Sequence, residues 1–105
     1  GAPGWPGAIS GGPFLGGGLG GAMGRSLDAT DRQRLFSTLE SQPDNRTTAW
    51  RNPNTGQQYQ ATPVNTFRSG GADCREYQMR AEIDGRWETV TGTACRDAQG
   101  RWINQ

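Results

Sequence analysis

The chain has 105 residues, with eleven basic and ten acidic side chains and a formal net charge of +1. This length allows one domain. The basic side chains are all arginine and are interspersed with acidic ones, without the basic cluster typical of nucleic-acid binding. Histidine, the commonest general base and metal ligand, is absent. We therefore expect no catalytic residue, no cofactor or metal, and neither nucleic acid nor a small-molecule substrate as a partner.

A glycine-rich segment without charge covers residues 1–24, and an ordinary polar domain follows over residues 25–105. In the first segment glycine recurs at every fourth residue, at Gly12, Gly16, Gly20 and Gly24. On a helix this spacing gives a smooth edge along which two backbones can approach, as in membrane helix pairs. In water the same composition is typical of a flexible linker, which is the alternative interpretation. We hypothesise that these glycines mediate membrane association or self-association.

The pattern over residues 26–42 predicts the one clear helix. Asp28 or Thr30 suits its N-cap, and Thr30 with Gln33 would form a capping box. The helix has a narrow apolar stripe of Leu35, Phe36 and Leu39, which we expect to pack on a sheet. Pro43 ends the helix.

Beyond residue 46 the pattern changes to strands separated by turn signals. We expect five strands, over residues 47–51, 57–68, 73–83, 86–96 and 101–104. The second should be broken, or lie at an edge, near Pro63. One helix followed by consecutive antiparallel strands predicts an α+β fold with its sheet in meander order.

The Asp-Gly pair at residues 84–85 predicts a two-residue hairpin turn, since such a turn needs positive φ at both positions. If Ile83 faces Arg86, the same register places Cys74 directly opposite Cys95. That pair is non-hydrogen-bonded, with Cα atoms about 4.5 Å apart, which suits a disulfide. The sequence therefore predicts a cross-strand disulfide and an oxidising compartment, with two free buried cysteines as the alternative.

Alternation along this hairpin separates two faces. The face expected to join the core carries Tyr77, Met79, Ala81 and Ile83. The other face carries the cysteines, Trp87, several threonines and charged residues. Its Glu76 and Glu82 would lie about 20 Å apart at 3.3 Å per residue, too far for the paired carboxylates of a glycosidase. The pattern indicates a solvated face.

Four aromatic side chains are candidates for binding a partner: Trp50, Tyr59, Trp87 and Trp102. Exposed aromatic residues are typical hot spots of interfaces. Packing into a small core is the alternative, and two or more of them clustered on the surface would favour a binding module.

Several motifs together resemble those of a known family. They are Gly24-Arg25-Ser26-Leu27-Asp28, Trp50-Arg51-Asn52-Pro53-Asn54-Thr55-Gly56, Cys74-Arg75-Glu76-Tyr77 and Gly92-Thr93-Ala94-Cys95-Arg96. The chain is similar to the 17-kDa surface-antigen family of bacterial outer-membrane lipoproteins, which carry a glycine-zipper region before a small C-terminal domain. The resemblance implies an envelope location and a lipid anchor on an N-terminal cysteine. Residues 1–24 contain no cysteine, so the anchor is assigned to no residue of this chain.

Composition and resemblance together predict a non-enzymatic protein of the cell envelope, either structural or a surface antigen, at the outer membrane or facing the periplasm. Its expected partners are the membrane, envelope proteins or further copies of itself. The alternative is a binding module for a protein or for peptidoglycan. The first residues lack a signal-peptide pattern, and we expect a processed N-terminus.

Overall fold

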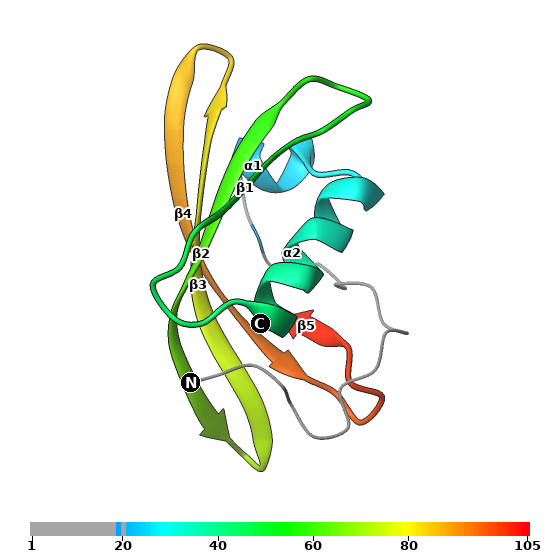
Figure 1. The fold of residues 1–105 in the computed structure, drawn as a ribbon, viewed down its shortest axis with the longest axis vertical. Coiled ribbons are helices and arrows are strands. Elements are labelled where there is room, and N and C mark those ends of the chain that lie inside the picture. Colours follow the sequence, from blue (N-terminus) through cyan, green and yellow to red (C-terminus); the bar gives the residue numbers. More distant parts are fainter. Residues whose placement is uncertain (1–18, 20) are drawn as a thin grey trace.

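A computed structural model describes Leu19 and residues 21–105 of the protein. Two helices pack on one face of a five-stranded antiparallel sheet (Figure 1). The helices are α1, Gly21–Ser26, and α2, Ala29–Ser41. The strands, in both chain and sheet order, are β1 (Thr48–Arg51), β2 (Gln58–Ser69), β3 (Ala72–Ile83), β4 (Arg86–Arg96) and β5 (Trp102–Asn104). The predicted α+β fold with a meander sheet is confirmed.

The helical region differs from the prediction of one helix over residues 26–42. Asp28 has an extended backbone, with φ −107° and ψ −171°, so no helix can continue through it. Its carboxylate accepts a hydrogen bond from the Asp31 N–H at 3.2 Å, and the Asp31 carboxylate accepts one from the Asp28 N–H at 3.0 Å. The capping box is therefore formed by Asp28 and Asp31, and the predicted box of Thr30 with Gln33 is wrong. The short helix α1 precedes this break.

The β3–β4 hairpin has the register that its turn predicts. Asp84 and Gly85 both have positive φ, and Ile83 pairs with Arg86. In β2 the register shifts between Pro63 and Asn65, where the sequence predicts an interruption. This irregularity adds one residue to β2, so residues beyond it point to the face opposite to that expected from simple alternation.

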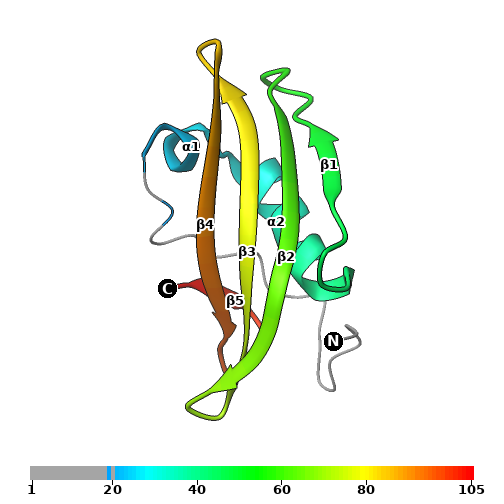
Figure 2. The ribbon, with the colours of Figure 1, turned by 90° about the vertical axis from the view of Figure 1, so that its left-hand side faces the viewer.

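The core lies between the helices and the sheet. From the helices it takes the predicted stripe of α2 together with Met23 of α1. The sheet contributes the predicted face of β3, where Tyr77, Met79 and Ala81 are fully buried and Ile83 is partly buried, together with the buried residues Trp50, Tyr59, Ala61, Ala94 and Trp102. We call the sheet surface away from the helices the open face (Figure 2).

Candidate functional site

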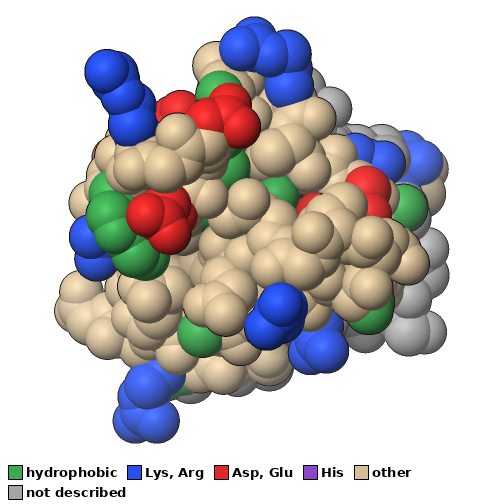
Figure 3. Space-filling view, turned by 90° about the horizontal axis from the view of Figure 1, so that it is seen from above, with side chains coloured by type: hydrophobic (Ala, Val, Ile, Leu, Met, Phe, Trp, Pro, Cys, Tyr) green, Lys and Arg blue, Asp and Glu red, His purple; other side chains and the backbone are tan. Residues whose placement is uncertain are grey.

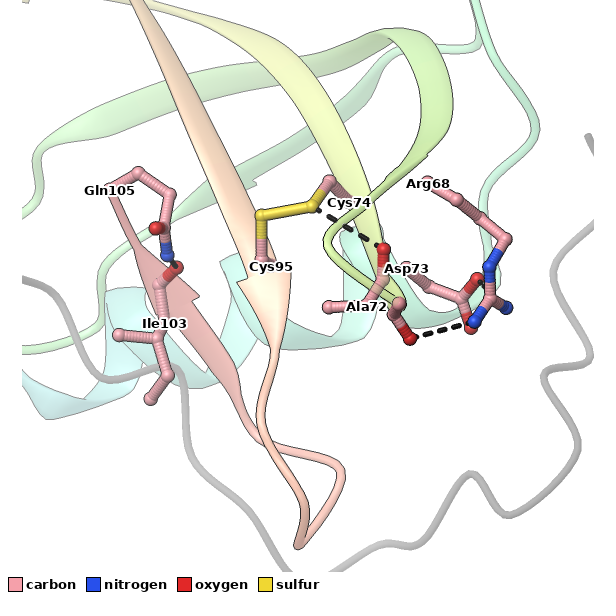
Figure 4. The surroundings of a disulfide bond; sticks show 8 residues. Arg68, Ala72, Asp73, Cys74, Cys95, Ile103 and Gln105 are labelled. Atoms are coloured by element: carbon pink, nitrogen blue, oxygen red, sulfur yellow. Dashed lines mark hydrogen bonds and ion pairs between the residues drawn. A yellow bond between two sulfur atoms is a disulfide. The ribbon is translucent and has the colours of Figure 1, made fainter.

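The disulfide between Cys74 and Cys95 joins β3 to β4 on the open face, beside Ile103 of β5 (Figure 4). The two Cα atoms lie 4.0 Å apart, and the predicted direct pairing is confirmed. Both cysteines are followed by arginine. Because successive side chains of a strand point to opposite faces, each Cys-Arg pair places a sulfur on the open face and a guanidinium on the helix side.

The first of these arginines, Arg75, is fully buried and holds the C-terminal end of α2. It donates hydrogen bonds to the Leu39 carbonyl at 2.7 Å, the Thr66 hydroxyl at 3.0 Å and the Asp44 carboxylate at 2.9 Å. A helix C-terminus has carbonyls without partners in the helix, so this guanidinium satisfies one of them. Burial acts to raise the pKa of Asp44, but hydrogen bonds from Arg75 and Thr66 outweigh it, and the pKa lies below its ordinary value.

The second arginine, Arg96, holds α2 at a neighbouring point. One of its terminal nitrogens donates to both oxygens of Glu40, at 2.6 and 2.7 Å, and the other donates to the Gly100 carbonyl at 3.1 Å. Its guanidinium carbon lies 5.0 Å from the centre of the Trp102 ring, and the Trp102 indole N–H also donates to Glu40 at 3.0 Å. In each Cys-Arg motif, the cysteine thus cross-links the sheet and the arginine attaches α2 to it.

The Trp50-to-Gly56 motif joins the β1–β2 turn to the beginning of α2. The Trp50 indole N–H and the Asn52 amide donate to the buried Asp31 carboxylate, at 3.0 and 2.9 Å. Asn52 also donates to Asp28 at 2.8 Å. Hydrogen bonding from Asn52 is the largest cause that lowers the pKa of Asp28, against an opposing effect of burial. The turn motif is therefore a structural connection between sheet and helix.

Three of the four aromatic candidates for partner binding lie in the core. Trp50, Tyr59 and Trp102 are buried, whereas the Trp87 side chain is 57% exposed. The burial leaves Trp87 as the member of the set that a partner can reach.

Trp87 stands on the open face next to Arg80, whose guanidinium carbon lies 4.8 Å from its ring centre. The two residues border a shallow groove of about 200 Å³, further lined by Gln58, Gln60 and Arg51. Seen from the end of the molecule that carries the β1–β2 and β3–β4 turns, charged side chains of both signs are spread out and hydrophobic ones form separate patches (Figure 3). The exposed indole with neighbouring amide and guanidinium groups could hold a polar ligand or a protein segment.

The glycine row extends beyond the described residues. Gly12, Gly16 and Gly20 lie outside them, and Gly24 lies within α1. A Cβ atom at Gly24 would overlap the Leu19 carbonyl oxygen, so this position needs glycine for a contact within the chain.

Neither helix of the described part of the chain is long and apolar enough to span a membrane. Among Leu19 and residues 21–105, acidic and cysteine side chains form no group of three that could hold a metal ion.

A family model described as the 17 kDa outer membrane surface antigen matches residues 37–103, from the middle of α2 into β5. The chain belongs to this family. A 17 kDa surface antigen of Rickettsia prowazekii (strain Madrid E) is 42% identical over 80 residues, which are 71% of this chain and 50% of that protein. One from Rickettsia bellii (strain RML369-C) is 34% identical over 85 residues, 76% of this chain and 54% of its own length.

The surface antigen of Rickettsia conorii (strain ATCC VR-613 / Malish 7) is 38% identical over 81 residues, 72% of this chain and 51% of that protein. The chain thus spans about half the length of these 17 kDa surface antigens. No solved structure matches it significantly. Membership of a family of outer-membrane surface antigens supports an envelope-associated role.

Among the residues that position this domain, sequence reasoning missed Arg75, Arg96, Asp31 and Asn52. The repeated Cys-Arg pair and the Trp-x-Asn turn are visible in the sequence, but their contacts depend on where α2 lies on the sheet.

Proposed function

We propose that this chain is a non-enzymatic, structural surface-antigen protein of the cell envelope. Its β-domain is a rigid unit projecting from the membrane, and its glycine-rich segment associates with the membrane or with other copies. The observation that carries the structural role is the use of the domain's buried polar groups. Asp31, Arg75 and the Arg96–Glu40 pair all hold the helix to the sheet. Groups engaged in this way stabilise a fold and are not available to a substrate.

Self-association rests on the four-residue spacing of glycine. A membrane helix gains little from burying apolar surface against lipid, so close backbone packing must supply the affinity. Leucine at Gly16 or Gly20 would hold two backbones apart. Leucine at Gly18, which a helix turns to the opposite side from the row, is the matched control.

The measurement is the amount of cross-linked oligomer in native membranes. We expect Gly16→Leu and Gly20→Leu to reduce it and Gly18→Leu to leave it near the wild-type amount. The thermal melt of the β-domain and its disulfide should stay unchanged in all three variants. Unchanged oligomer in both row variants would contradict self-association through this segment.

The second candidate is a binding module for an envelope protein or for peptidoglycan, and the exposed Trp87 with its groove favours it. The same leucine variants discriminate between the two candidates. If the amount of cross-linked oligomer is the same in both row variants as in the wild type, the glycine segment acts only as a tether. The binding module then becomes the better account of the protein's function.

A further inference from the structure

In the described part of the chain, strand β4 has a free edge that could pair with another strand. This feature does not depend on the glycine segment. Strand β4 pairs with β3 over residues 86–95, but with β5 only over residues 94–96. Within the described part of the chain, residues 86–92 therefore pair on one side only, and β4 borders the sheet along this stretch (Figure 2). An edge of this kind presents backbone N–H and C=O groups to a further strand.

The register identifies which residues present these groups. In a two-residue hairpin the closing pair, here Ile83 and Arg86, is hydrogen-bonded, and the pattern then alternates. The backbone groups of Trp87, Thr89 and Thr91 consequently point away from β3. A contact farther along the strand agrees with this phase, because the Thr93 carbonyl accepts a hydrogen bond from the Gln105 N–H at 2.7 Å.

The three edge residues lack the features that usually protect a free strand. Their side chains are exposed on the open face and uncharged, and none is proline. Native edges are commonly protected by charged side chains, proline or bulges. The charged residues of this stretch, Arg86 and Glu88, point to the helix-side face, where they restrict the registers in which a second strand can pair.

We propose that a second copy of this chain pairs with β4, antiparallel and about a two-fold axis at Thr89. This register matches the free groups of Trp87, Thr89 and Thr91 with the same set in the other copy. Thr89 faces its own equivalent, and Trp87 faces Thr91. Each of these pairs forms two hydrogen bonds.

Charge separates this register from its neighbour. With the axis at Thr89, Glu88 faces Val90 of the other copy, and no like charges meet. With the axis one residue earlier, Glu88 would face its own equivalent, which destabilises a sheet pair. In the chosen register the exposed Trp87 ring also covers Thr91 of the other copy, so the dimer removes an aromatic side chain from water.

A pair of proline substitutions in the full 105-residue chain tests the proposal in sedimentation experiments without membrane. Thr91→Pro removes an N–H that points out of the sheet, so the monomer keeps its ladder of hydrogen bonds. Val90→Pro removes an N–H that bonds to β3, and it is the matched control for lost folding. We expect Thr91→Pro to raise the dimer dissociation constant at least about tenfold and to change the melting temperature of the domain little. Val90→Pro should instead lower the melting temperature.

Two further variants test the register and keep the proposal falsifiable if proline disturbs the fold. Oxidation of Thr89→Cys should link two chains through the substituted position, since hydrogen-bonded pairs place Cα atoms about 5.5 Å apart. Gln78→Cys, exposed on the interior strand β3, should not link them. Thr89→Lys should weaken the dimer by placing like charges opposite each other.

The proposal would be overturned by a wild-type chain that stays monomeric up to about 100 μM, or by a dimer whose dissociation constant is changed by neither Thr91→Pro nor Thr89→Lys. Gly16→Leu should leave this dimer unchanged. A dimer lost with Gly16→Leu and kept with Thr91→Pro would refute pairing at β4 and support the glycine segment instead.

Discussion

Arg75 and Arg96 show how a two-residue motif serves both faces of a sheet. Each follows a disulfide cysteine, and each reaches the C-terminal end of α2. Alternation predicts that cysteine and arginine point to opposite faces. It does not predict the partners of the arginines, because these depend on where the helix packs.

Replacement of Arg75 by methionine tests this attachment. The substitution keeps an unbranched chain but leaves the Leu39 carbonyl without its donor and removes the partner of Asp44. We expect the free energy of unfolding to fall by about 2 kcal/mol or more in urea denaturation, since buried acceptors without partners are costly. The control is Arg34→Met on the exposed side of α2, expected to change stability by about 0.5 kcal/mol or less. Equal effects of the two substitutions would contradict an anchoring role.

Phe67 shows why burial was harder to predict than strand position. Counting by twos from the buried Ala61 would place Phe67 on the helix side, yet it pairs with Cys74 on the open face and is 36% exposed. The irregularity after Pro63 adds a residue and reverses the phase. Proline signals an interruption in a strand, but not whether the strand resumes with the same phase.

At the scale of elements, α2 is tied to the sheet at both ends. Asn52 and Trp50 hold the carboxylates that cap its beginning, and Arg75 holds a carbonyl near its end. Both attachments use carboxylates with lowered pKa values, Asp28 and Asp44. The packing of the helix is therefore linked to the charge of these groups.

This linkage predicts a loss of stability in acid. A folded-state pKa below the ordinary value of 3.8 means that folding stabilises the carboxylate. Its contribution is complete above the unfolded-state pKa and is lost as the pH falls through the folded-state pKa. We expect the free energy of unfolding, measured in urea, to decrease below about pH 4.

Burial acts to raise the pKa of Asp97, but hydrogen bonds from Arg101 and Gln99 outweigh it, so this pKa also lies below its ordinary value. Asp44→Asn removes one of these carboxylates, so the free energy of unfolding of the variant should fall less steeply in acid than that of the wild type. Circular dichroism at neutral pH checks that the variant is folded. If the free energy of unfolding falls as steeply with decreasing pH in the variant as in the wild type, other carboxylates cause the acid sensitivity.

The elements differ in how well the sequence predicts them. The β3–β4 hairpin was predicted in register because the Asp-Gly turn fixes the pairing of every residue that follows. The helical region was predicted with the wrong start. Asp28 was identified as a cap, but the short helix before it forms by packing Met23 into the core, which no local pattern indicates.

The whole molecule combines one small core with one covalent link. The disulfide joins residues 21 apart, and a link of this span contributes about 3 kcal/mol in the chain-entropy model. For a domain of this size that contribution is a large share of the net stability. The fold and the link were predictable from local signals. The hairpin register also places Trp87 on the face opposite the predicted core face, whereas no local pattern separates burial from exposure for Trp50 and Trp102.

A disulfide that contributes this share of the stability is typical of proteins in an oxidising compartment, which agrees with an envelope-associated surface antigen. We therefore expect the domain to lie outside the cytoplasm with Cys74 and Cys95 joined. Intact cells are treated with acid to quench thiol exchange, and the denatured protein is then alkylated with and without reductant. We expect neither cysteine to be alkylated until reductant is added, with the intact mass rising by two labels. Full alkylation of both cysteines without reductant would contradict the account.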